Sequence, residues 1–200
     1  MTSLPLSRRE RKKQQNRQRL LDCAVHLFQT QGFDATTVDD IAEAADVSRG
    51  TFFNYFPTKE HLLDDIGEAA LRDLERRTNA ELADEPSAVA KIRTLMRGLA
   101  LDSTTSLQLT RHILLNAMRT PSPTSPTVRL RAILEKLVWE AQGSGEIRAD
   151  LDPAHVTSAI TGVYLEAFFR WLSADANGAP TSTEDVDAIV NLLFEGIATK

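Results

Sequence analysis

The sequence predicts an all-α protein of about nine helices, with an N-terminal three-helix domain and a larger C-terminal helical domain. Apolar residues recur at steps of three and four along most of the chain, which is the period of amphipathic helices. No strand-like alternation, internal repeat or low-complexity tract stands out. With 200 residues, of which 42% are hydrophobic and 26% charged, the chain can bury a core in one or two domains.

The net charge of −5 is unevenly distributed along the chain. Residues 1–63 carry 9 Lys and Arg against 8 Asp and Glu, whereas residues 64–200 carry 14 against 20. The segment 8–19 alone holds seven basic residues, and only Glu10 opposes them. Charges more than about 10 Å apart are screened at physiological salt. The local basic segment, and not the net charge, therefore decides whether this part of the chain attracts a polyanion.

Several classes of protein are excluded by what the sequence lacks. The single cysteine, Cys23, cannot form an intrachain disulfide, which fits a reducing compartment. The N-terminus has no apolar signal core, and no apolar run approaches the ~20 residues of a membrane span. We therefore expect a soluble, cytoplasmic protein with no membrane partner. The four histidines share no metal-ligand spacing, and no phosphate loop or nucleophile elbow occurs. We expect no metal, no cofactor, no catalytic residue and no enzyme.

The first helix is expected to end near Gln31, where Gly32 can supply a left-handed stop. After it, residues 37–56 predict a helix-turn-helix motif. Thr37 and Ser48 can cap the two helices, because each hydroxyl can accept an unpaired amide of the first turn. Between them, Asp46 is one of the few non-glycine residue types that tolerates a left-handed backbone.

The second helix of this motif is expected to turn a polar side outward. Phe52 and Phe56 are four residues apart and should point inward, and Pro57 ends the helix. Arg49 can donate two hydrogen bonds to a guanine edge. The other outward groups can bond base edges, touch a thymine methyl or contact phosphates. The predicted DNA contacts in and around the motif are Thr37, Ser48, Arg49, Thr51, Phe53, Asn54, Tyr55 and Lys59.

The basic segment before the motif permits two interpretations. It is either the solvated start of the first helix or a basic arm that lies along or in a DNA groove. We favour the arm, because the segment is joined to a helix-turn-helix and basic residues add affinity through counterion release. The residues assigned to this role are Arg8, Arg9, Lys12, Lys13 and Arg17.

Six more helices are expected after the motif. The fourth runs from just after Pro57 to about Asn79, with Thr58 as its cap and Lys59 in its first turn, and it is long enough to belong to both domains. The others are expected over 87–101, 105–119, 125–142, 153–173 and 183–198. The last two carry apolar residues on most sides, so they must be covered on most sides. They are either central core helices or a dimer face.

The run FDATTVDDIAEAADVSRGTFFNYFPTKEHLL resembles the DNA-binding domain of the TetR (tetracycline-repressor) family. The matching signature is Gly32-Phe33, Thr36-Thr37, Ile41-Ala42, Ala45, Val47-Ser48, Gly50-Thr51, Tyr55-Phe56 and Lys59-Glu60. Two positions depart from it: Asp46 replaces the more usual turn glycine, and Phe53 stands where a tyrosine is commoner. Phe53 therefore lacks a hydroxyl that could bond a phosphate. The resemblance implies DNA contacts at the positions given above and adds Gly50.

The resemblance also implies that the two domains have different functions. Residues 1–63 would form the DNA-binding domain, and residues 64–200 a ligand-binding and dimerisation domain. Two copies would bind a palindromic double-stranded DNA operator as a homodimer. The implied interface residues are Ile160, Tyr164, Trp171, Val186, Ile189, Val190, Leu193 and Ile197.

A ligand pocket between the fourth and eighth helices is the last implication. Its candidate lining residues are Leu107, Ile113, Met118, Leu134, Trp139, Phe168 and Phe169. Such a lining suits a small hydrophobic effector. The FFNYFP and GEIRADLDP segments resemble those of family members that bind acyl-CoA-like ligands. We expect a sequence-specific transcriptional regulator, specifically a repressor that the ligand releases. The alternatives are a regulator that no ligand releases and a helical-bundle interaction protein.

Overall fold

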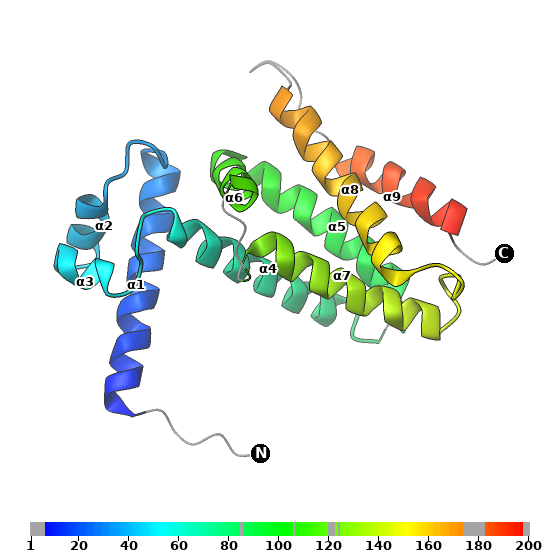
Figure 1. The fold of residues 1–200 in the computed structure, drawn as a ribbon, viewed down its shortest axis with the longest axis horizontal. Coiled ribbons are helices and arrows are strands. Elements are labelled where there is room, and N and C mark those ends of the chain that lie inside the picture. The colour runs from blue at the N-terminus through cyan, green and yellow to red at the C-terminus, as the bar shows by residue number, and fades with distance from the viewer. Residues whose placement is uncertain are drawn as a thin grey trace. The chain divides into compact units, whose positions relative to one another are not determined.

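The computed structural model describes residues 7–84, 86–105, 107–119, 123, 125–173 and 183–197. Within these ranges the chain forms helices and no strand, which confirms the all-α prediction (Figure 1). The helices are α1 (Arg8–Thr30), α2 (Val38–Ala44), α3 (Arg49–Phe53), α4 (His61–Glu81), α5 (Ala88–Thr105), α6 (Leu107–Arg119), α7 (Pro126–Gly143), α8 (Pro153–Ser173) and α9 (Thr183–Ile197). Across this described part, none of the helices has the length and apolar character needed to traverse a bilayer.

The chain divides into two compact units, and the boundary falls inside α4, between Gly67 and Glu68. The first unit contains α1, α2, α3, the start of α4, and α6 from Gln108 onward. The second unit contains the rest of α4 with α5, α7, α8 and α9. The sequence assigned residues 105–119 to the C-terminal domain, but α6 packs within the first unit.

The core of the first unit is built from the apolar stripes of its helices. Leu20 of α1, Ile41 of α2, Phe52 of α3 and Leu62 of α4 are fully buried there. Burial of each such side chain stabilises the fold by about 1.5–3 kcal/mol. Leu109 of α6 joins the same cluster, which explains why α6 belongs to this unit.

Local chemistry sets where the first helices begin and end. Ser7 and Glu10 form a capping box, so α1 already begins at Arg8. Gly32 and Asp46 both have positive φ, at 88° and 51°, as the sequence predicts for the two turns. The basic segment is thus helical in the described residues, and its contact with a DNA groove stays a prediction.

Two predicted helix ends near the motif are wrong. The helix expected to reach Phe56 ends at Phe53, with Asn54 as its C-cap. The next helix begins at His61, so Thr58 and Lys59 lie in a turn before it. The Phe56 amide still donates to the Phe52 carbonyl oxygen at 3.0 Å, but Pro57 disfavours helical dihedrals at Phe56, so the helix does not continue.

In the second unit, α7 packs against α5 and α8, and α9 packs against α5 and α8 (Figure 1). Gly98 lets α5 approach α4 closely, since a Cβ there would overlap the Cδ1 atom of Leu74. The start of α5 is held by Glu146 from the turn after α7. That carboxylate accepts hydrogen bonds from the Ser87 hydroxyl and from the backbone amide of Ala88, at 3.0 Å.

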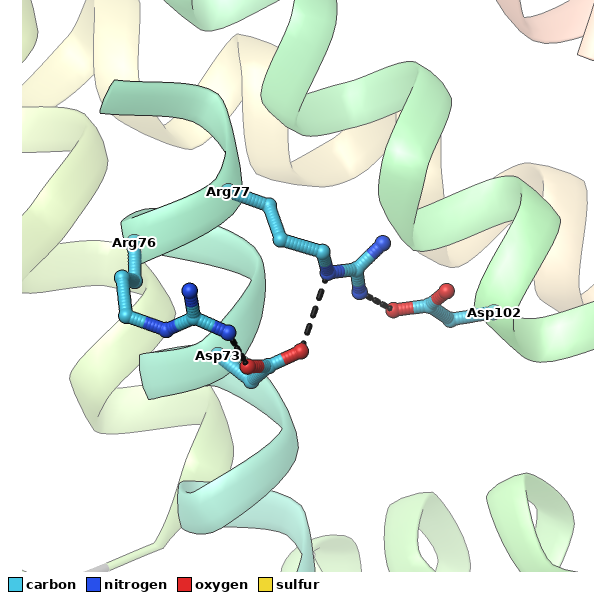
Figure 2. A network of polar contacts seen from close by, with 4 residues as sticks. All are labelled: Asp73, Arg76, Arg77 and Asp102. Atoms are coloured by element: carbon cyan, nitrogen blue, oxygen red, sulfur yellow. Dashed lines mark hydrogen bonds and ion pairs between the residues drawn. The ribbon is translucent and has the colours of Figure 1, made fainter. Parts of the chain in front are cut away.

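An exposed polar network also joins α4 to α5 in this unit. Figure 2 shows Arg77 between Asp73, one turn earlier in α4, and Asp102 of α5. Arg77 Nη2 donates to Asp102 Oδ2 at 2.6 Å, and its Nε donates to Asp73 Oδ2 at 3.0 Å. Arg76 pairs with the same Asp73. Because these side chains are about half exposed, the network contributes little to stability and mainly fixes local geometry.

Candidate DNA-binding surface

The two helices of the motif are short and closely capped. Thr37 Oγ1 accepts a hydrogen bond from the Asp40 amide at 3.1 Å, and Asp40 Oδ2 accepts one from the Thr37 amide at 2.8 Å. The Thr37 amide and hydroxyl hold the pKa of Asp40 below its ordinary value. At the start of α3, Ser48 Oγ accepts from the Thr51 amide at 3.1 Å and bonds the Thr51 hydroxyl at 2.8 Å. Both predicted caps are therefore confirmed, and these hydroxyls already have partners inside the chain.

The inward and outward sides of α3 are those that the sequence predicts. Phe52 is fully buried and Phe56 is 2% exposed, with ring centroids 5.8 Å apart. Six of the nine predicted contact residues in and around the motif are exposed: Thr37, Ser48, Arg49, Gly50, Phe53 and Asn54. Thr51 and Tyr55 are half-buried, and Tyr55 packs partly against the core of the first unit. A row of polar groups around one large ring thus faces outward at the start of α3.

Arg49 does not extend freely from this surface. Its Nη1 donates to Oδ2 of Asp39, on α2, at 2.5 Å. Its Cζ lies 5.5 Å from the centroid of the Phe53 ring. The guanidinium is therefore held by a carboxylate and an aromatic ring, one from each helix of the motif.

The Lys59 ammonium makes contacts that the sequence does not predict. Its Nζ donates to the backbone carbonyl oxygens of Phe33 and Thr36, at 2.7 and 2.8 Å. The ammonium also lies 4.2 Å from the centroid of the Phe33 ring. Lys59 thus ties the start of α4 to the turn between α1 and α2, with one of its three N–H donors left for a phosphate. The predicted phosphate contact stays a prediction.

The basic residues of α1 are exposed along its first three turns: Arg8, Arg9, Lys12, Lys13 and Arg17. Arg17 differs from the others because it pairs with Asp65 of α4 and lies 5.3 Å from the Phe56 ring centroid. That pair stabilises the packing of α1 against α4 in the first unit. The other four are available to a polyanion, although their contact with DNA stays a prediction.

A short, capped helix held against a second helix by a left-handed turn, with an exposed polar row and basic residues beside it, defines a helix-turn-helix DNA-binding protein.

The same unit also contains contacts of α6 that the sequence did not predict. His112 of α6 stacks on Phe33 with ring centroids 4.7 Å apart, and its Nε2 lies 3.9 Å from Asp34 Oδ2. Asn116 of α6 donates to Asp64 Oδ1 of α4 at 3.2 Å.

Comparison with known proteins identifies the family. Residues 20–66 match the family model described as bacterial regulatory proteins of the tetR family. The fold resembles the crystal structure of Thermus thermophilus FadR, a TetR-family transcriptional repressor in complex with lauroyl-CoA. The TM-score is 0.75 and the identity 28%, over 92% of this chain and 96% of that one. The chain therefore belongs to the TetR family of bacterial transcriptional regulators.

Two further relatives extend the comparison. The HTH-type transcriptional repressor DhaR of Mycobacterium sp. (strain GP1) is 26% identical over 190 residues, which cover 90% of this chain and 91% of that protein. RolR in complex with the ligand resorcinol has a TM-score of 0.71 at 22% identity, over 96% of this chain and 91% of that one, a likeness of fold alone. Both DhaR and the Thermus thermophilus FadR are named as transcriptional repressors.

The predicted dimer residues have different environments in the second unit. Ile160, Tyr164, Val186 and Val190 are buried within the single chain, so they form its own core and offer no surface to a partner. This part of the interface prediction is corrected. Ile189 and Leu193 are half-buried. The side chains of Trp171 and Ile197 lie outside the described residues. On α8 and α9, the prediction did not assign to the interface two large exposed apolar side chains, Phe169, at 41% exposure, and Leu192, at 68%.

The predicted pocket residues have different environments in the described part of the chain. Leu134 and Phe168 are buried in the core, while Met118, Trp139 and Phe169 are exposed. Ile113 packs against the core of the first unit, and the side chain of Leu107 lies outside the described residues. Their grouping around a ligand stays a prediction.

A cavity of about 70 Å³ does occur in the second unit, but other residues line it. Polar and charged side chains from α4, α5 and α7 dominate this lining: Glu75, Thr78, Asn79, Lys91, Lys136 and Glu140. Thr78 is 4% exposed, and its hydroxyl is among the buried polar atoms without a hydrogen-bond partner in the described residues. Pockets for drug-sized ligands usually measure about 300–1,000 Å³. The cavity as it stands holds only water-sized molecules.

Proposed function

We propose that this TetR-family chain is a repressor that binds a palindromic operator as a homodimer and is released by a small apolar effector. The observation that carries the DNA-binding part is the exposed row that begins at Ser48. Arg49 and Asn54 present donors and acceptors of the kind that read base edges in the major groove. The exposed basic residues at the start of α1 supply the sequence-independent attraction to phosphates.

The homodimer follows from how a helix-turn-helix reads DNA. One α3 covers only a few base pairs, and two copies related by a two-fold axis read half-sites about 34 Å apart or multiples of that distance. The apolar surface left on α8 and α9 supports this proposal. Phe169 and Leu192 are exposed, and Ile189 and Leu193 are partly so. A partner copy would remove this apolar area from water.

The effector is proposed from similarity. The FadR structure, which is 28% identical to this chain, contains lauroyl-CoA. An acyl-CoA-like ligand is far larger than the cavity of about 70 Å³ between α4, α5 and α7. Binding would therefore require a conformation in which these helices are further apart. A ligand that binds only this conformation shifts the population toward it, and DNA affinity falls if that state binds the operator less well.

The test uses the full-length protein and a pool of random-sequence duplexes. Repeated selection should enrich one palindromic duplex, and Arg49→Ala should weaken binding to it by about 1–3 kcal/mol while relaxing preference at one base pair. Sedimentation should show a dimer in the absence of DNA, and one dimer bound to each duplex in its presence. If no sequence is enriched, the DNA-binding proposal is wrong, and the helical-bundle alternative gains support.

Lauroyl-CoA tests the effector on the same duplex. It should lower the affinity of the wild-type protein for the enriched duplex, whereas free CoA at the same concentration should not. The exposed apolar acyl chain requires a control for detergent-like effects, and sodium laurate at matched concentration provides it. If lauroyl-CoA does not lower the affinity, the effector proposal is refuted for this ligand class, and the regulator is of the kind that acyl-CoA does not release.

A further inference from the structure

Asp39 is an acidic residue beside a surface that is proposed to bind a polyanion, and the caps of its helix do not need it. The start of α2 is capped by Thr37 and Asp40, and the start of α3 by Ser48. The Asp39 side chain is 64% exposed and that of its partner Arg49 is 60% exposed. An exposed ion pair of this kind adds little to fold stability. Its main effect is on where the Arg49 side chain lies.

The contacts with Asp39 and with the Phe53 ring leave part of the Arg49 guanidinium free. Asp39 Oδ2 accepts from Nη1 at 2.5 Å, and the Phe53 ring centroid lies 5.5 Å from Cζ. Within the part of the chain that the structure describes, neither Nη2 nor Nε has a hydrogen-bond partner. Two N–H groups in a fork are what a guanine O6 and N7 edge requires. Arg49 is therefore held with donors still free, and fewer rotamers are lost when they engage a base.

The same carboxylate acts against binding to DNA of any sequence. Asp39 places a carboxylate next to the exposed row of α3, where phosphates would approach. This repulsion applies to every duplex, because the phosphate backbone is the same in all of them. The gain from holding Arg49 applies only where a guanine is correctly placed. The two effects together raise the ratio of specific to non-specific affinity.

We infer that Asp39 is a specificity-determining positioning residue: it holds Arg49 for base recognition and disfavours binding to unselected DNA. This inference rests on the proposed DNA-binding function of α3. It gives α2 a part in sequence discrimination, although Asp39 lies ten positions before Arg49 in the chain.

The test compares Asp39→Asn with Glu43→Gln, a matched control on the same helix. Glu43 is also exposed, and no contact joins it to Arg49 in the described residues, so both variants remove one negative charge from α2. Affinities are measured for the duplex enriched by the wild-type protein and for poly(dA-dT), at one salt concentration. Both variants should bind poly(dA-dT), which has no guanine-type O6 and N7 edge, about two- to fivefold more tightly. Only Asp39→Asn should lower the specificity ratio, by about five- to tenfold.

Two further variants exclude a simple structural effect. Asp39→Ala should repeat the result of Asp39→Asn, and all variants should melt at the wild-type temperature. In an Arg49→Ala background, Asp39→Asn should no longer lower the ratio, since the side chain it positions is gone.

The outcomes separate the inference from the function on which it rests. If the wild-type protein enriches a duplex but Asp39→Asn keeps its specificity ratio, or loses it equally without Arg49, then the inference about Asp39 is wrong and the proposed function stands. If the wild-type protein binds every duplex no better than poly(dA-dT), the proposed function is wrong and the inference falls with it.

Discussion

Replacing Lys59 separates a structural role from a DNA contact at a single side chain. The sequence places Lys59 on a phosphate, whereas its Nζ donates to the carbonyl oxygens of Phe33 and Thr36 at 2.7 and 2.8 Å. Lys59→Met keeps most of the apolar stem over the Phe33 ring and removes the ammonium. We expect it to destabilise the first unit by about 2 kcal/mol. The fold around the turn between α1 and α2 should loosen first.

The magnitude follows from the contacts that are lost. A hydrogen bond to a charged group contributes about 1.5–3 kcal/mol, and an ammonium over an exposed ring about 0.5–1 kcal/mol. The two carbonyl oxygens are only partly buried, so water recovers a good part of these bonds in the variant. The net loss of about 2 kcal/mol corresponds to local opening about 30 times more frequent.

Hydrogen exchange of peptides spanning residues 31–41 measures this opening without assuming that the whole chain unfolds in one step. Lys13→Met is the matched control, because Lys13 is exposed on α1 and lies outside the core. Both variants should lower the salt dependence of DNA binding by about one phosphate contact at most. Only Lys59→Met should accelerate exchange. If exchange in this segment is unchanged while DNA affinity falls, the two carbonyl contacts do not stabilise the turn.

Three further predictions concern stability. Gly98→Ala should lower the free energy of unfolding by about 1–3 kcal/mol, because the added methyl overlaps Leu74, whereas Gly162→Ala meets open space and should raise it by about 0.5–1 kcal/mol; thermal melts with the opposite order would contradict this. Burial raises the pKa of Glu146, but hydrogen bonds from Ser87, Ser144 and two backbone amides outweigh it and hold the pKa below its ordinary value of 4.5. Since the folded pKa is the lower one, this stability is present above about pH 4.5 and is lost as pH falls through the folded pKa, so the melting curve of Glu146→Gln should depend less on pH in that range; parallel curves would refute the role. Phe52→Ala should cost about 3–5 kcal/mol in the first unit and abolish DNA binding, as measured by hydrogen exchange and duplex binding; wild-type exchange in α3 would count against this.

The helical architecture was predictable because its signals are local. Periodic apolar residues, capping hydroxyls and glycine or proline at the ends act within a turn or two of the chain. Thr37, Ser48, Gly32 and Asp46 have the conformations expected from their types alone. The end of α3 was misplaced because the apolar spacing of Phe52 and Phe56 continues after the helix does. Phe56 is buried from a turn, where periodicity no longer reports conformation.

The contacts around the site were not predictable from local patterns. Asp39 and Arg49 lie ten positions apart on separate helices, and Lys59 contacts carbonyl oxygens 23 and 26 positions earlier. Nothing in the spacing of these residues indicates that they meet. The same limit explains why predicted interface residues such as Ile160 are buried inside their own chain. An apolar residue such as Ile160 or Leu134 has the same sequence signature whether it packs inside its own chain, lines a cavity or faces a partner.

The sequence by itself determined the class of fold, the place of the recognition helix and the side of that helix that faces outward. Each of these depends on the chemistry of neighbouring residues, which the order of amino acids states directly. Only the tertiary structure decided what holds Arg49 and Lys59, which unit contains α6, and which apolar side chains remain exposed on α8 and α9. These depend on which helix faces meet, and that is settled by the packing of the whole chain.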